Sequence, residues 1–474
     1  MRKRSSFLTR VSFFILFMLI FLLSSLFNRI DLVCLVSFDY AKIRSQISEA
    51  LEGGEERREE CPEHFRWIHE DLKPWSSTGI SRDMLHSAAA TNMSNFRLLI
   101  LNGKPYLEKY KTCFATRDVF TLWGILQLLR LYPDSVPDLD LLFQCDDLTV
   151  VKKTSFPDHL PPPPPLFHYC GDDHSFDIVF PDWTFWGWAE TNIRAWERTS
   201  KSIQDNNHRS QWKDRQPLAF WRGNTRVAST RHTLSHCNAT DHYHSKAHIY
   251  SLQWDKETKR GRNNHTKLEN QCDHRYKIYV EGRSWSVSEK YILACDSMAL
   301  FIQPNYYDFF SRSLVPLHHY WPVSVKNMCQ DITFAVEWGN SNPDKAEAIG
   351  KEGSSFVEQN LRMELVYDYM LHVLREYAKL LRFKVTVPEG AVQVSLETLT
   401  SMVNRKARKF LEDSKVQKPA TDRPPCKMPP PFEPQQLHVL LHTKQSLIKQ
   451  VEMEGNQYWK SRHINNKFEK RYVV

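Results

Sequence analysis

The pattern of apolar and polar positions predicts an α/β fold, and one stretch past the middle of the chain shows it most clearly. Residues 277–280 have a short, mostly apolar strand pattern that ends at Glu281 and Gly282. A serine-rich turn follows, then apolar positions with helical spacing over 287–295 and a second apolar run over 298–302. Strand, loop, helix and strand in this order are the building block of a parallel sheet.

The turn before the predicted helix has the composition of an anion site. Ser286 and Glu289 fit the capping-box pattern, which makes Ser286 the expected N-cap. A helix N-terminus that follows a strand presents free backbone N–H groups and the positive end of the helix dipole. Because Ser284, Ser288 and Lys290 are close in sequence, the turn is a candidate cradle for a diphosphate. The alternative is an ordinary capped helix without a ligand.

Similar patterns predict elements along the rest of the chain. The pair Asn102-Gly103 follows an apolar strand and is typical of a hairpin turn. Helix 365–383 is amphipathic and is expected to pack across two domains. The other predicted elements are strands at 96–101, at 139–143 and from 217 to a break at 222–225, and helices at 119–132 and 435–459.

Charged residues follow two of these strands. Asp146 and Asp147 come shortly after strand 139–143, and α/β proteins bind ligands at the carboxyl ends of their strands. Arg222 and Gly223 lie where the other strand breaks. An arginine there can bind phosphate in a bidentate manner, and a glycine lets a ligand approach the backbone. We therefore expect ligand-binding residues at both strand ends.

Residues 177–190, DIVFPDWTFWGWAE, are dense in aromatic side chains. Trp183, Trp186 and Trp188, together with Glu190, suit a groove for a sugar or peptide acceptor, because aromatic ring faces pack well against apolar C–H groups. The same tryptophans would also suit a hydrophobic core. The sequence leaves both interpretations open.

The N-terminus predicts a membrane anchor. Basic residues at positions 2, 3, 4 and 10 precede residues 11–27, which are apolar except for serine. This length is at the lower limit for a helix that spans a bilayer, and the basic flank predicts a cytoplasmic N-terminus. A cleaved signal peptide is the alternative. In either case the body of the chain enters the secretory pathway, so we expect a single-pass type II protein of the Golgi or endoplasmic reticulum membrane.

Glycosylation sequons and cysteines indicate the same compartment. Sequons begin at Asn92, Asn238 and Asn264. The chain has 10 cysteines, and an oxidising lumen favours disulfides. Because Cys34 lies beside the predicted anchor, the remaining number is odd and at least one thiol is expected to stay unpaired. The absence of a CxxC pair argues against a structural zinc site of that kind.

The histidines and the net charge bear on which partners are expected. Histidines are concentrated between residues 232 and 248, but their spacing matches no common zinc-ligand pair, so a metal is not expected. The formal net charge of +8 suits a negatively charged substrate or a membrane surface. That charge is spread along the chain and no nucleic-acid recognition motif is present, so nucleic acid is not an expected partner.

Several motifs, in order along the chain, resemble one known family. They are DIVFPDWTFWGWAE, AFWRGN, HRYKIYVEGRSWSVSEKYILACDS and YWPV. Together they closely resemble the Rumi-type protein O-glucosyltransferases, a family that also includes fungal capsule-associated xylosyltransferases and a plant branch. The resemblance covers about residues 61–390. It looks closest to the plant branch, whose members share the N-terminal anchor and the Pro-rich tail.

The resemblance implies a GT-B fold, in which two Rossmann-like domains face a cleft. It also implies an inverting transfer of glucose or xylose from UDP-glucose or UDP-xylose to a hydroxyl of a protein or glycan acceptor, without a metal or other cofactor. The implied organisation is a cytoplasmic tail (1–10), a transmembrane signal anchor (11–27), a stem (28–60), a lumenal acceptor and base domain (61–205), a UDP-sugar-binding domain with a closing helix (206–390) and a basic, Pro-rich tail (391–474).

By the same resemblance, Asp147 is the catalytic base, and its neighbour Asp146 is the alternative. Animal members have an arginine where this chain has Ser288, so another basic residue would have to meet the diphosphate charge; Lys290, Arg226 and Arg231 are the candidates. The expected donor-binding set is Arg222, which matches the arginine of the family's F-R-G motif, with Gly223, Asn224, Arg231, Ser286, Ser288 and Lys290.

The spacing of Cys272 and Cys295 matches a disulfide of this family. Asp138 and Asp140 imitate the DxD metal motif of another glycosyltransferase class, but they flank the start of a strand and are expected to face solvent. Two other functions stay open: a cell-wall polysaccharide xylosyltransferase, and a non-catalytic, lectin-like protein of the same fold.

Overall fold

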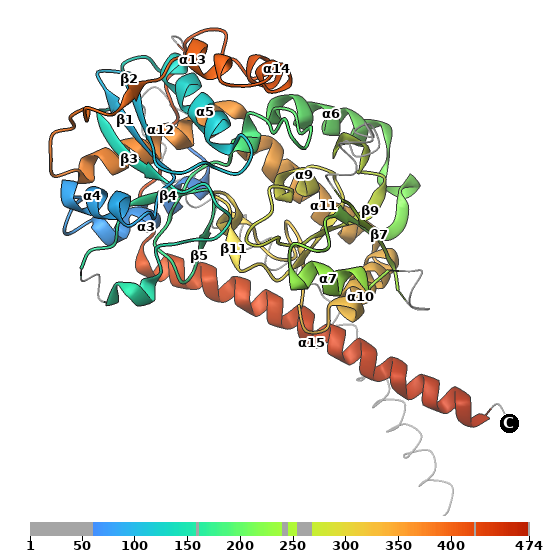
Figure 1. The fold of residues 1–474 in the computed structure, drawn as a ribbon. Coiled ribbons are helices and arrows are strands. Elements are labelled where there is room, and N and C mark those ends of the chain that lie inside the picture. Colours follow the sequence, from blue (N-terminus) through green and yellow to red (C-terminus); the bar gives the residue numbers. More distant parts are fainter. Residues whose placement is uncertain (1–59, 158–160, 239–244, 254–267, 421–422, 473–474) are drawn as a thin grey trace, which may run out of the picture. The chain divides into compact units, whose positions relative to one another are not determined.

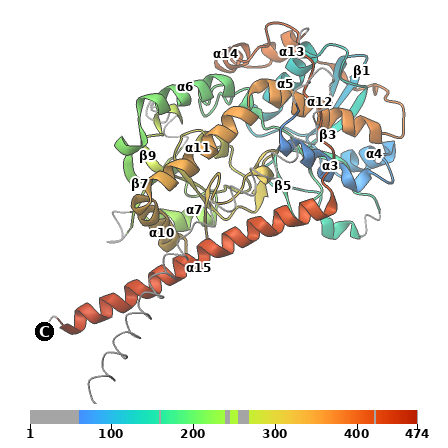
Figure 2. The same cartoon turned by 180° about the vertical axis from the view of Figure 1, so that it is seen from behind.

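The computed structural model describes residues 60–157, 161–238, 245–253, 268–420 and 423–472. Residues 58–474 form one compact unit, whose elements are shown in Figures 1 and 2. The predicted cytoplasmic tail and anchor, the stem up to residue 59 and the sequon at Asn264 lie outside the described residues. Within the described ranges, no helix combines the length and the apolar composition that a membrane span needs.

The N-terminal half contains a mixed sheet of six strands, in the order β13-β2-β1-β3-β4-β6. β1 pairs in the antiparallel sense with β2 and β3, whereas β4 is parallel to both β3 and β6. The strands predicted at 96–101 and 139–143 are confirmed as β1 and β3. The six strands are β1 (Phe96–Leu101), β2 (Lys104–Lys109), β3 (Leu139–Phe143), β4 (Leu166–His168), β6 (Ile178–Val179) and β13 (Val392–Gln393).

A tight turn joins β1 to β2. Asn102 and Gly103 both have positive φ angles, 50° and 71°, which is the conformation of a type I′ hairpin turn. The predicted hairpin is confirmed. Helices α3 (Trp67–Leu72), α4 (Arg82–Ala90), α5 (Arg117–Leu131) and α12 (Met363–Leu380) belong to this half.

The C-terminal half contains a five-stranded sheet in which every pair of neighbours is parallel. Such a sheet is covered on both faces, and all five residues of β10 are buried accordingly. The strands, in sheet order, are β12 (Trp321–Val323), β10 (Met298–Ile302), β9 (His274–Tyr279), β7 (Gln216–Gly223) and β8 (Ala247–Ser251). The accompanying helices are α6 (Trp196–Arg209), α7 (Ser229–Ser235), α9 (Glu289–Leu293), α10 (Met328–Ser341) and α11 (Pro343–Asn360).

A small two-stranded sheet links the two halves. β5 (Gly171–Asp172) follows β4, and β11 (Tyr306–Tyr307) follows β10; the two pair in the antiparallel sense. The Tyr307 hydroxyl also donates to the Asp172 carbonyl (3.2 Å). Segments that follow one strand of each large sheet therefore meet directly.

Helix α12 packs mainly on helices of the N-terminal half, and its Tyr369 ring also meets Phe309, which follows β11 (4.6 Å between ring centroids). It contacts α3 and α5, and the Tyr377 hydroxyl donates to the carbonyl oxygen of Asp140 in β3 (3.0 Å). The helix therefore reaches the segment after β11 as well. Its apolar face carries large side chains such as Tyr369 into a core that includes residues of both sheets, such as Phe143 and Phe301.

Residues 391–474, 84 positions, were expected to form a tail. Their described part is instead folded against the rest of the molecule, up to residue 462 or beyond. β13 extends the first sheet, and α13 (Leu396–Ser401) packs on α5. The other helices are α14 (Arg405–Asp413) and the long α15 (Pro434–Tyr472), red in Figures 1 and 2, which contacts α10 and β12.

Among the described residues there are four disulfides and one buried free thiol, Cys170. This confirms that the cysteines mostly pair and leave one over. The pairs are Cys61–Cys426, Cys113–Cys145, Cys237–Cys329 and Cys272–Cys295.

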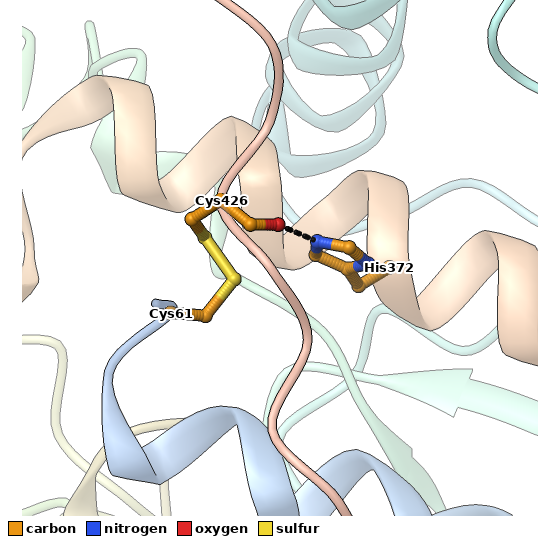
Figure 3. Close-up of side chains that lie close together, drawn as sticks. All are labelled: Cys61, His372 and Cys426. Atoms are coloured by element: carbon orange, nitrogen blue, oxygen red, sulfur yellow. Dashed lines mark hydrogen bonds between the residues drawn. A yellow bond between two sulfur atoms is a disulfide. The ribbon is translucent and has the colours of Figure 1, made fainter. Parts of the chain in front are cut away.

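Cys61, Cys426 and His372 are also the one grouping of possible metal ligands in the described part of the chain. The two sulfurs are bonded to each other, and His372 Nε2 hydrogen bonds to the Cys426 carbonyl (2.8 Å), as Figure 3 shows. Burial lowers the pKa of His372, so the imidazole is a neutral hydrogen-bond donor here. The grouping is a cross-link between the two ends of the folded unit.

Replacing both cysteines, Cys61→Ser with Cys426→Ser, should lower the free energy of unfolding by about 2–5 kcal/mol, because the cross-link spans most of the folded chain. Chemical denaturation of the purified chain measures this. Cys170→Ser is the control, since it removes a thiol and no cross-link and should cost less. Equal stability of the double variant and the parent would contradict the expected role.

Candidate active site

The second sheet supplies one side of the candidate site through the loops at its strand ends. Numbered along the chain, its strands lie in the order second, first, third, fourth and fifth. In doubly wound sheets, ligands bind beyond the carboxyl ends of the strands at the point where the order reverses. That point lies between β7 and β9, so the loops after Gly223 and after Tyr279 are the expected ligand loops.

Arg231 connects these two loops. It lies on α7, which follows the β7 loop, and it donates to the backbone oxygens of Glu281 (2.8 Å) and Val280 (3.2 Å) and to the Ser286 hydroxyl (3.2 Å). Burial lowers the pKa of Arg231 to about 10, so the guanidinium is still charged at neutral pH. The structure therefore brings together Arg231 and Ser286, two of the expected donor-binding residues.

Ser286 is not the N-cap of the helix, contrary to the capping-box prediction. α9 begins at Glu289, and the cap position is Ser288, whose side chain makes no capping hydrogen bond. Burial raises the pKa of Glu289 to about 7, and its carboxyl bonds to Ser311 and Tyr279 in the interior instead of reaching back to the turn. Because α9 has only 5 residues, its dipole is small, and the loop itself has to supply the anion contacts.

The hydroxyls of Ser286 and Ser288 nevertheless lie together, 2.8 Å apart. The Tyr279 hydroxyl accepts a hydrogen bond from the Ser286 N–H (3.2 Å), and the Gly282 N–H donates to the Ser284 carbonyl (2.9 Å). The loop over 280–288 is thus a compact turn with two adjacent hydroxyls and a cation, Arg231, at its side.

Arg222 lies at the end of β7, as expected, but on the other face of the sheet from Arg231. Its guanidinium carbon lies over the rings of Phe220 (5.5 Å) and Tyr250 (5.4 Å), whereas that of Arg231 lies over Trp221 (5.4 Å). Successive residues of a strand point to opposite faces, which explains the separation. The structure does not bring these two guanidinium groups together.

The turn after β7 is formed by local side-chain hydrogen bonds. The Asn224 side-chain oxygen accepts from the Arg226 N–H (3.0 Å), and the Thr225 and Ser251 hydroxyls are 2.8 Å apart. At Gly223 a Cβ atom would lie 2.5 Å from the Trp221 ring, so a larger residue would disturb this strand end. Gly223 and Asn224 therefore shape the loop beside Arg231.

Lys290 is buried, and apart from the Val287 carbonyl at the end of the loop (3.5 Å) its ammonium binds interior partners, so its placement does not favour a donor-binding role. Its ammonium donates to the Asp182 carboxylate (3.0 Å) and to the Thr184 hydroxyl (2.7 Å), and the two charged side chains are 1% and 0% exposed. Burial opposes charge on Lys290, but Asp182 outweighs it and raises the pKa of the ammonium. Burial and the Asp182 carboxylate raise the pKa of nearby Asp308, which favours its neutral form.

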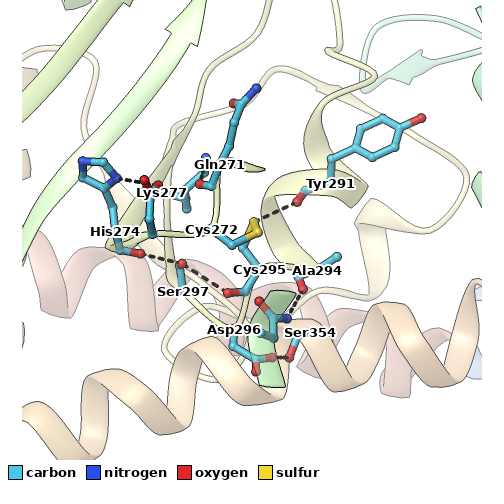
Figure 4. Close-up of a disulfide and its surroundings, with 12 residues drawn as sticks. Gln271, Cys272, His274, Lys277, Tyr291, Ala294, Cys295, Asp296, Ser297 and Ser354 are labelled. Carbon is cyan, nitrogen blue, oxygen red and sulfur yellow. Dashed lines mark hydrogen bonds and ion pairs between the residues drawn. A yellow bond between two sulfur atoms is a disulfide. The ribbon is translucent and has the colours of Figure 1, made fainter. Parts of the chain in front are cut away.

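The disulfide Cys272–Cys295, which the family resemblance implied, is present (Figure 4). It joins Cys272, two residues before β9, to Cys295, two residues after α9, and so closes the segment that contains the ligand loop. Ser297 supports the same region by donating to the His274 carbonyl (2.7 Å). A second support is Gly350 of α11, where a Cβ atom would lie 2.6 Å from the Asp296 carbonyl oxygen, so only glycine permits this contact.

The first sheet supplies the other side of the site, just beyond the end of β3. The Asp147 side chain is 33% exposed, and its Oδ1 accepts a hydrogen bond from Arg117 (2.9 Å). Arg117 also donates to the Cys145 carbonyl (2.9 Å), and the disulfide of Cys145 with Cys113 ties this strand end to the segment before α5. Asp147 therefore has a held carboxylate that is still open to solvent, which suits a general base.

Asp146, the alternative base, contributes its backbone to the structure. Its carbonyl bonds to His168 Nε2 (3.0 Å), and its N–H donates to the Gln144 side chain (2.9 Å). Its carboxylate is exposed. Of the two neighbours, Asp147 is the one whose carboxylate is oriented by a charged partner.

Trp183 and Trp186 do not form an acceptor groove, because they are only 1% and 0% exposed. Trp186 donates to the Tyr367 hydroxyl (2.9 Å), and its ring fills the space left by the missing side chain of Gly124 in α5. The alternative interpretation, a core role, is correct for these two. The groove prediction fails here because a stretch of aromatic residues has the same appearance in a core and at a surface.

Trp188 and Glu190 stay nearer to solvent. Trp188 is partly exposed and packs edge-on against Trp183 (5.1 Å between ring centroids). Glu190 is exposed and accepts a hydrogen bond from Thr116, the residue before α5 (3.0 Å). Of the four expected acceptor residues, these two lie near the start of α5, where Arg117 contacts Asp147.

Two exposed apolar residues beside Asp147 were missed by the sequence prediction. Phe114 is 65% exposed and Leu148 is 44% exposed. Leu148 directly follows Asp147, and the Phe114 ring lies 5.2 Å from the Arg117 guanidinium. The only sequence cue was Cys113 next to Phe114, and its pairing with Cys145 was not predictable from the sequence. Arg117 was missed for the same reason.

The two sides of the site meet at Trp285 and Cys170. Trp285, in the ligand loop, packs edge-on against the rings of His168 (6.1 Å) and Trp183 (6.1 Å). The Cys170 sulfur lies 3.6 Å from the Asp147 carbonyl oxygen, and Ser284 and Trp285 of the ligand loop lie next to it. Burial raises the pKa of this thiol, which therefore stays neutral. The Asp147 segment and the ligand loop thus share direct neighbours.

The DxD-like pair does not form a metal surface. Asp140 is 1% exposed and binds Arg97 through both carboxylate oxygens (2.7 Å each). Asp138 is exposed and accepts from the Asn102 N–H (2.8 Å). The expectation that both face solvent is wrong for Asp140. Successive side chains of a strand point to opposite faces of the sheet, and that of Asp140 points to the buried Arg97.

The remaining expected features are placed as follows. Asn92 is exposed at the end of α4, whereas the Asn238 amide donates to the Ile249 carbonyl (3.3 Å). Cys237 of the histidine-rich segment is bonded to Cys329, and His242 and His244 lie outside the described residues.

Comparison with known proteins identifies the family. The model for glycosyl transferase family 90 matches residues 56–455 of the chain. The chain belongs to glycosyl transferase family 90. The match includes both sheets, the ligand loop and Asp147, and extends beyond the region of about 61–390 in which the motifs were noticed.

This family 90 glycosyltransferase is similar to curated relatives over most of their length. An O-glucosyltransferase rumi homolog of Anopheles gambiae is 24% identical over 372 residues, which are 76% of this chain and 89% of that protein. Protein O-glucosyltransferase 1 of Rattus norvegicus is 26% identical over 363 residues, 74% of this chain and 88% of that protein. O-glucosyltransferase rumi of Drosophila melanogaster is 23% identical over 368 residues, 74% and 87% of the two chains.

Lys290→Met tests whether this residue is structural in the family 90 enzyme. It leaves the buried Asp182 carboxylate without its cation and should lower the free energy of unfolding by about 3–5 kcal/mol. Adding Asp182→Asn should recover part of the loss, because the uncompensated charge disappears. Urea unfolding monitored by tryptophan fluorescence gives both values. A single variant of unchanged stability but weakened UDP binding would instead support donor binding by Lys290.

Proposed function

We propose that this glycosyltransferase moves glucose from UDP-glucose to a hydroxyl of a protein acceptor, with inversion at the anomeric carbon and without a metal. The observation that carries the proposal is the meeting of the Asp147 segment with the ligand loop over 280–288, through Trp285 and Cys170. A carboxylate base and an anion-binding loop on facing segments are the two parts that such a transfer needs.

The donor diphosphate would lie against the switch-point loops of the second sheet. Arg231 supplies a cation there, and the Ser286 and Ser288 hydroxyls and the backbone N–H groups of the loop supply hydrogen bonds. Arg231 thus supplies the positive charge at this loop, where Ser288 offers only a hydroxyl. The positive charge offsets the negative charge that grows on UDP as it leaves.

Asp147 would accept the proton of the acceptor hydroxyl while that oxygen attacks the anomeric carbon. A single displacement, in which the bond to UDP breaks as the new bond forms, converts an α-linked donor into a β-linked product. A metal is not invoked because Arg231 offers charge at the loop. In addition, Asp140 of the DxD-like pair is taken up by Arg97.

The acceptor would approach over the surface beside Asp147. Phe114, Leu148 and Trp188 offer apolar contact, and Glu190 offers a carboxylate, near the start of α5 where Arg117 holds Asp147. The choice of a protein acceptor and of glucose rests on the relatives, which are named protein O-glucosyltransferase and O-glucosyltransferase rumi. UDP-xylose and polysaccharide acceptors are the alternatives to be tested beside them.

The secretory pathway is the proposed location, in the Golgi or the endoplasmic reticulum. Four disulfides among the described residues support an oxidising compartment, in which such cross-links persist. The apolar segment at 11–27 would hold the catalytic domain at the lumenal face of the membrane.

Asp147→Asn should reduce kcat for sugar transfer by about 10²–10⁴-fold, because the amide cannot accept the acceptor proton. UDP binding, measured by calorimetry, should be unchanged. Asp146→Asn is the matched control and should keep most of the activity. The assay uses UDP-glucose and UDP-xylose in parallel, with and without EDTA. Full activity of Asp147→Asn would refute the base assignment, and loss of activity in EDTA would refute the metal-free mechanism.

Phe114→Ala should raise KM for the acceptor by about 10-fold, the loss expected for one well-buried aromatic contact, and leave donor hydrolysis without acceptor unchanged. Val392→Ala is a suitable control, because Val392 is 63% exposed on the edge strand β13. It should change neither value. An unchanged acceptor KM for Phe114→Ala would mean that the acceptor binds elsewhere.

A further inference from the structure

We propose that Arg117 is a positioning residue of the transfer reaction: its guanidinium orients the Asp147 carboxylate toward the acceptor hydroxyl. This inference rests on the proposed function, in which Asp147 is the base. Arg117 begins α5 and is separated from Asp147 by 30 positions in sequence, so nothing in the sequence pattern links the two.

The guanidinium joins the carboxylate to the frame of the first sheet. One terminal nitrogen donates to the Cys145 carbonyl and the other to Asp147 Oδ1, both at 2.9 Å. Cys145 lies just past the end of β3 and is held by its disulfide to Cys113. Because the guanidinium is planar and rigid, its bond to the fixed Cys145 carbonyl also fixes the position of the Asp147 carboxylate.

Aromatic rings hold the arginine itself. Its guanidinium carbon lies 4.3 Å from the centre of the Trp183 ring, 5.2 Å from that of Phe114 and 5.9 Å from that of Trp188. The side chain is only 7% exposed, so few other conformations are open to it. A guanidinium stacked on an aromatic face keeps its edge free for hydrogen bonds, and here that edge faces Asp147 and Cys145.

The arrangement leaves one carboxylate oxygen for chemistry. Oδ1 of Asp147 is bound to Arg117, whereas in the described part of the chain no side chain donates to Oδ2. With 33% of the side chain exposed, Oδ2 is the oxygen that an acceptor hydroxyl can reach. Because rotation of the carboxylate would break the Arg117 bond, the reactive oxygen keeps one direction, and orientation of this kind contributes strongly to rate.

The test compares Arg117→Lys and Arg117→Ala with the parent. Both should lower kcat by about 10–100-fold with a less than about 3-fold change in the KM for UDP-sugar, because orientation and not donor binding is lost. Lysine should restore part of the rate, and added guanidinium ion should raise the rate of Arg117→Ala. In an Asp147→Asn background, Arg117→Lys should cause no further loss, since no base remains to be oriented.

Arg97→Lys is the matched control, because Arg97 is also a buried arginine in a bidentate pair, with Asp140, in the same half of the molecule. It should lose stability but keep kcat per folded molecule. Unchanged or increased kcat in the Arg117 variants would overturn the proposal, as would an equal loss in the Asp147→Asn background, which indicates a purely structural role. A normal rate for Asp147→Asn with Arg117 intact would show instead that the base assignment has failed, and the inference with it.

Discussion

The ion pair between Lys290 and Asp182 is the interaction on which the arrangement of the site depends. Lys290 follows the ligand loop of the second sheet, and Asp182 directly precedes Trp183 in the N-terminal half. Both charges are fully buried, so each would be very costly without the other, and separation of the two segments is strongly opposed. The pair therefore fixes the ligand loop relative to the segment that carries Trp183.

From that pair a short series of contacts leads to Asp147, the proposed base. Trp183 contacts Trp285 of the ligand loop and stacks on Arg117, and Arg117 holds Asp147. Two disulfides hold the ends of this series: Cys272–Cys295 closes the ligand-loop segment, and Cys113–Cys145 fixes the strand end at Asp147. The site is thus assembled on rigid elements, and its chemistry is exposed only at the loop hydroxyls, at Arg231 and at one side of Asp147.

Local patterns in the sequence located β1, β3, β7, β9 and β10, because buried strands such as β10 are continuous apolar runs with clear ends. The two- and three-residue strands, such as β4 and β6, are too short for such a pattern. Local patterns also placed Asp147 and the ligand loop at strand ends. They failed where a side chain's partner is distant in sequence. Lys290 pairs with Asp182, which is 108 positions away in sequence, and is therefore buried. Glu289 bonds to Tyr279 and Ser311 in the interior and does not complete the predicted capping box. The sequence around Arg117 gives no sign of its role, because that role depends on a contact with Asp147, which is 30 positions further along the chain.

In the proposed mechanism the donor diphosphate binds at the switch point of the second sheet, across from Asp147. A crystal structure of residues 58–474 with bound UDP tests whether it does. We expect the diphosphate to contact Arg231 and the loop over 280–288, with the accessible oxygen of Asp147 facing the position of the transferred sugar. UDP bound away from this loop, or on the side of the loop that does not face Asp147, would contradict it.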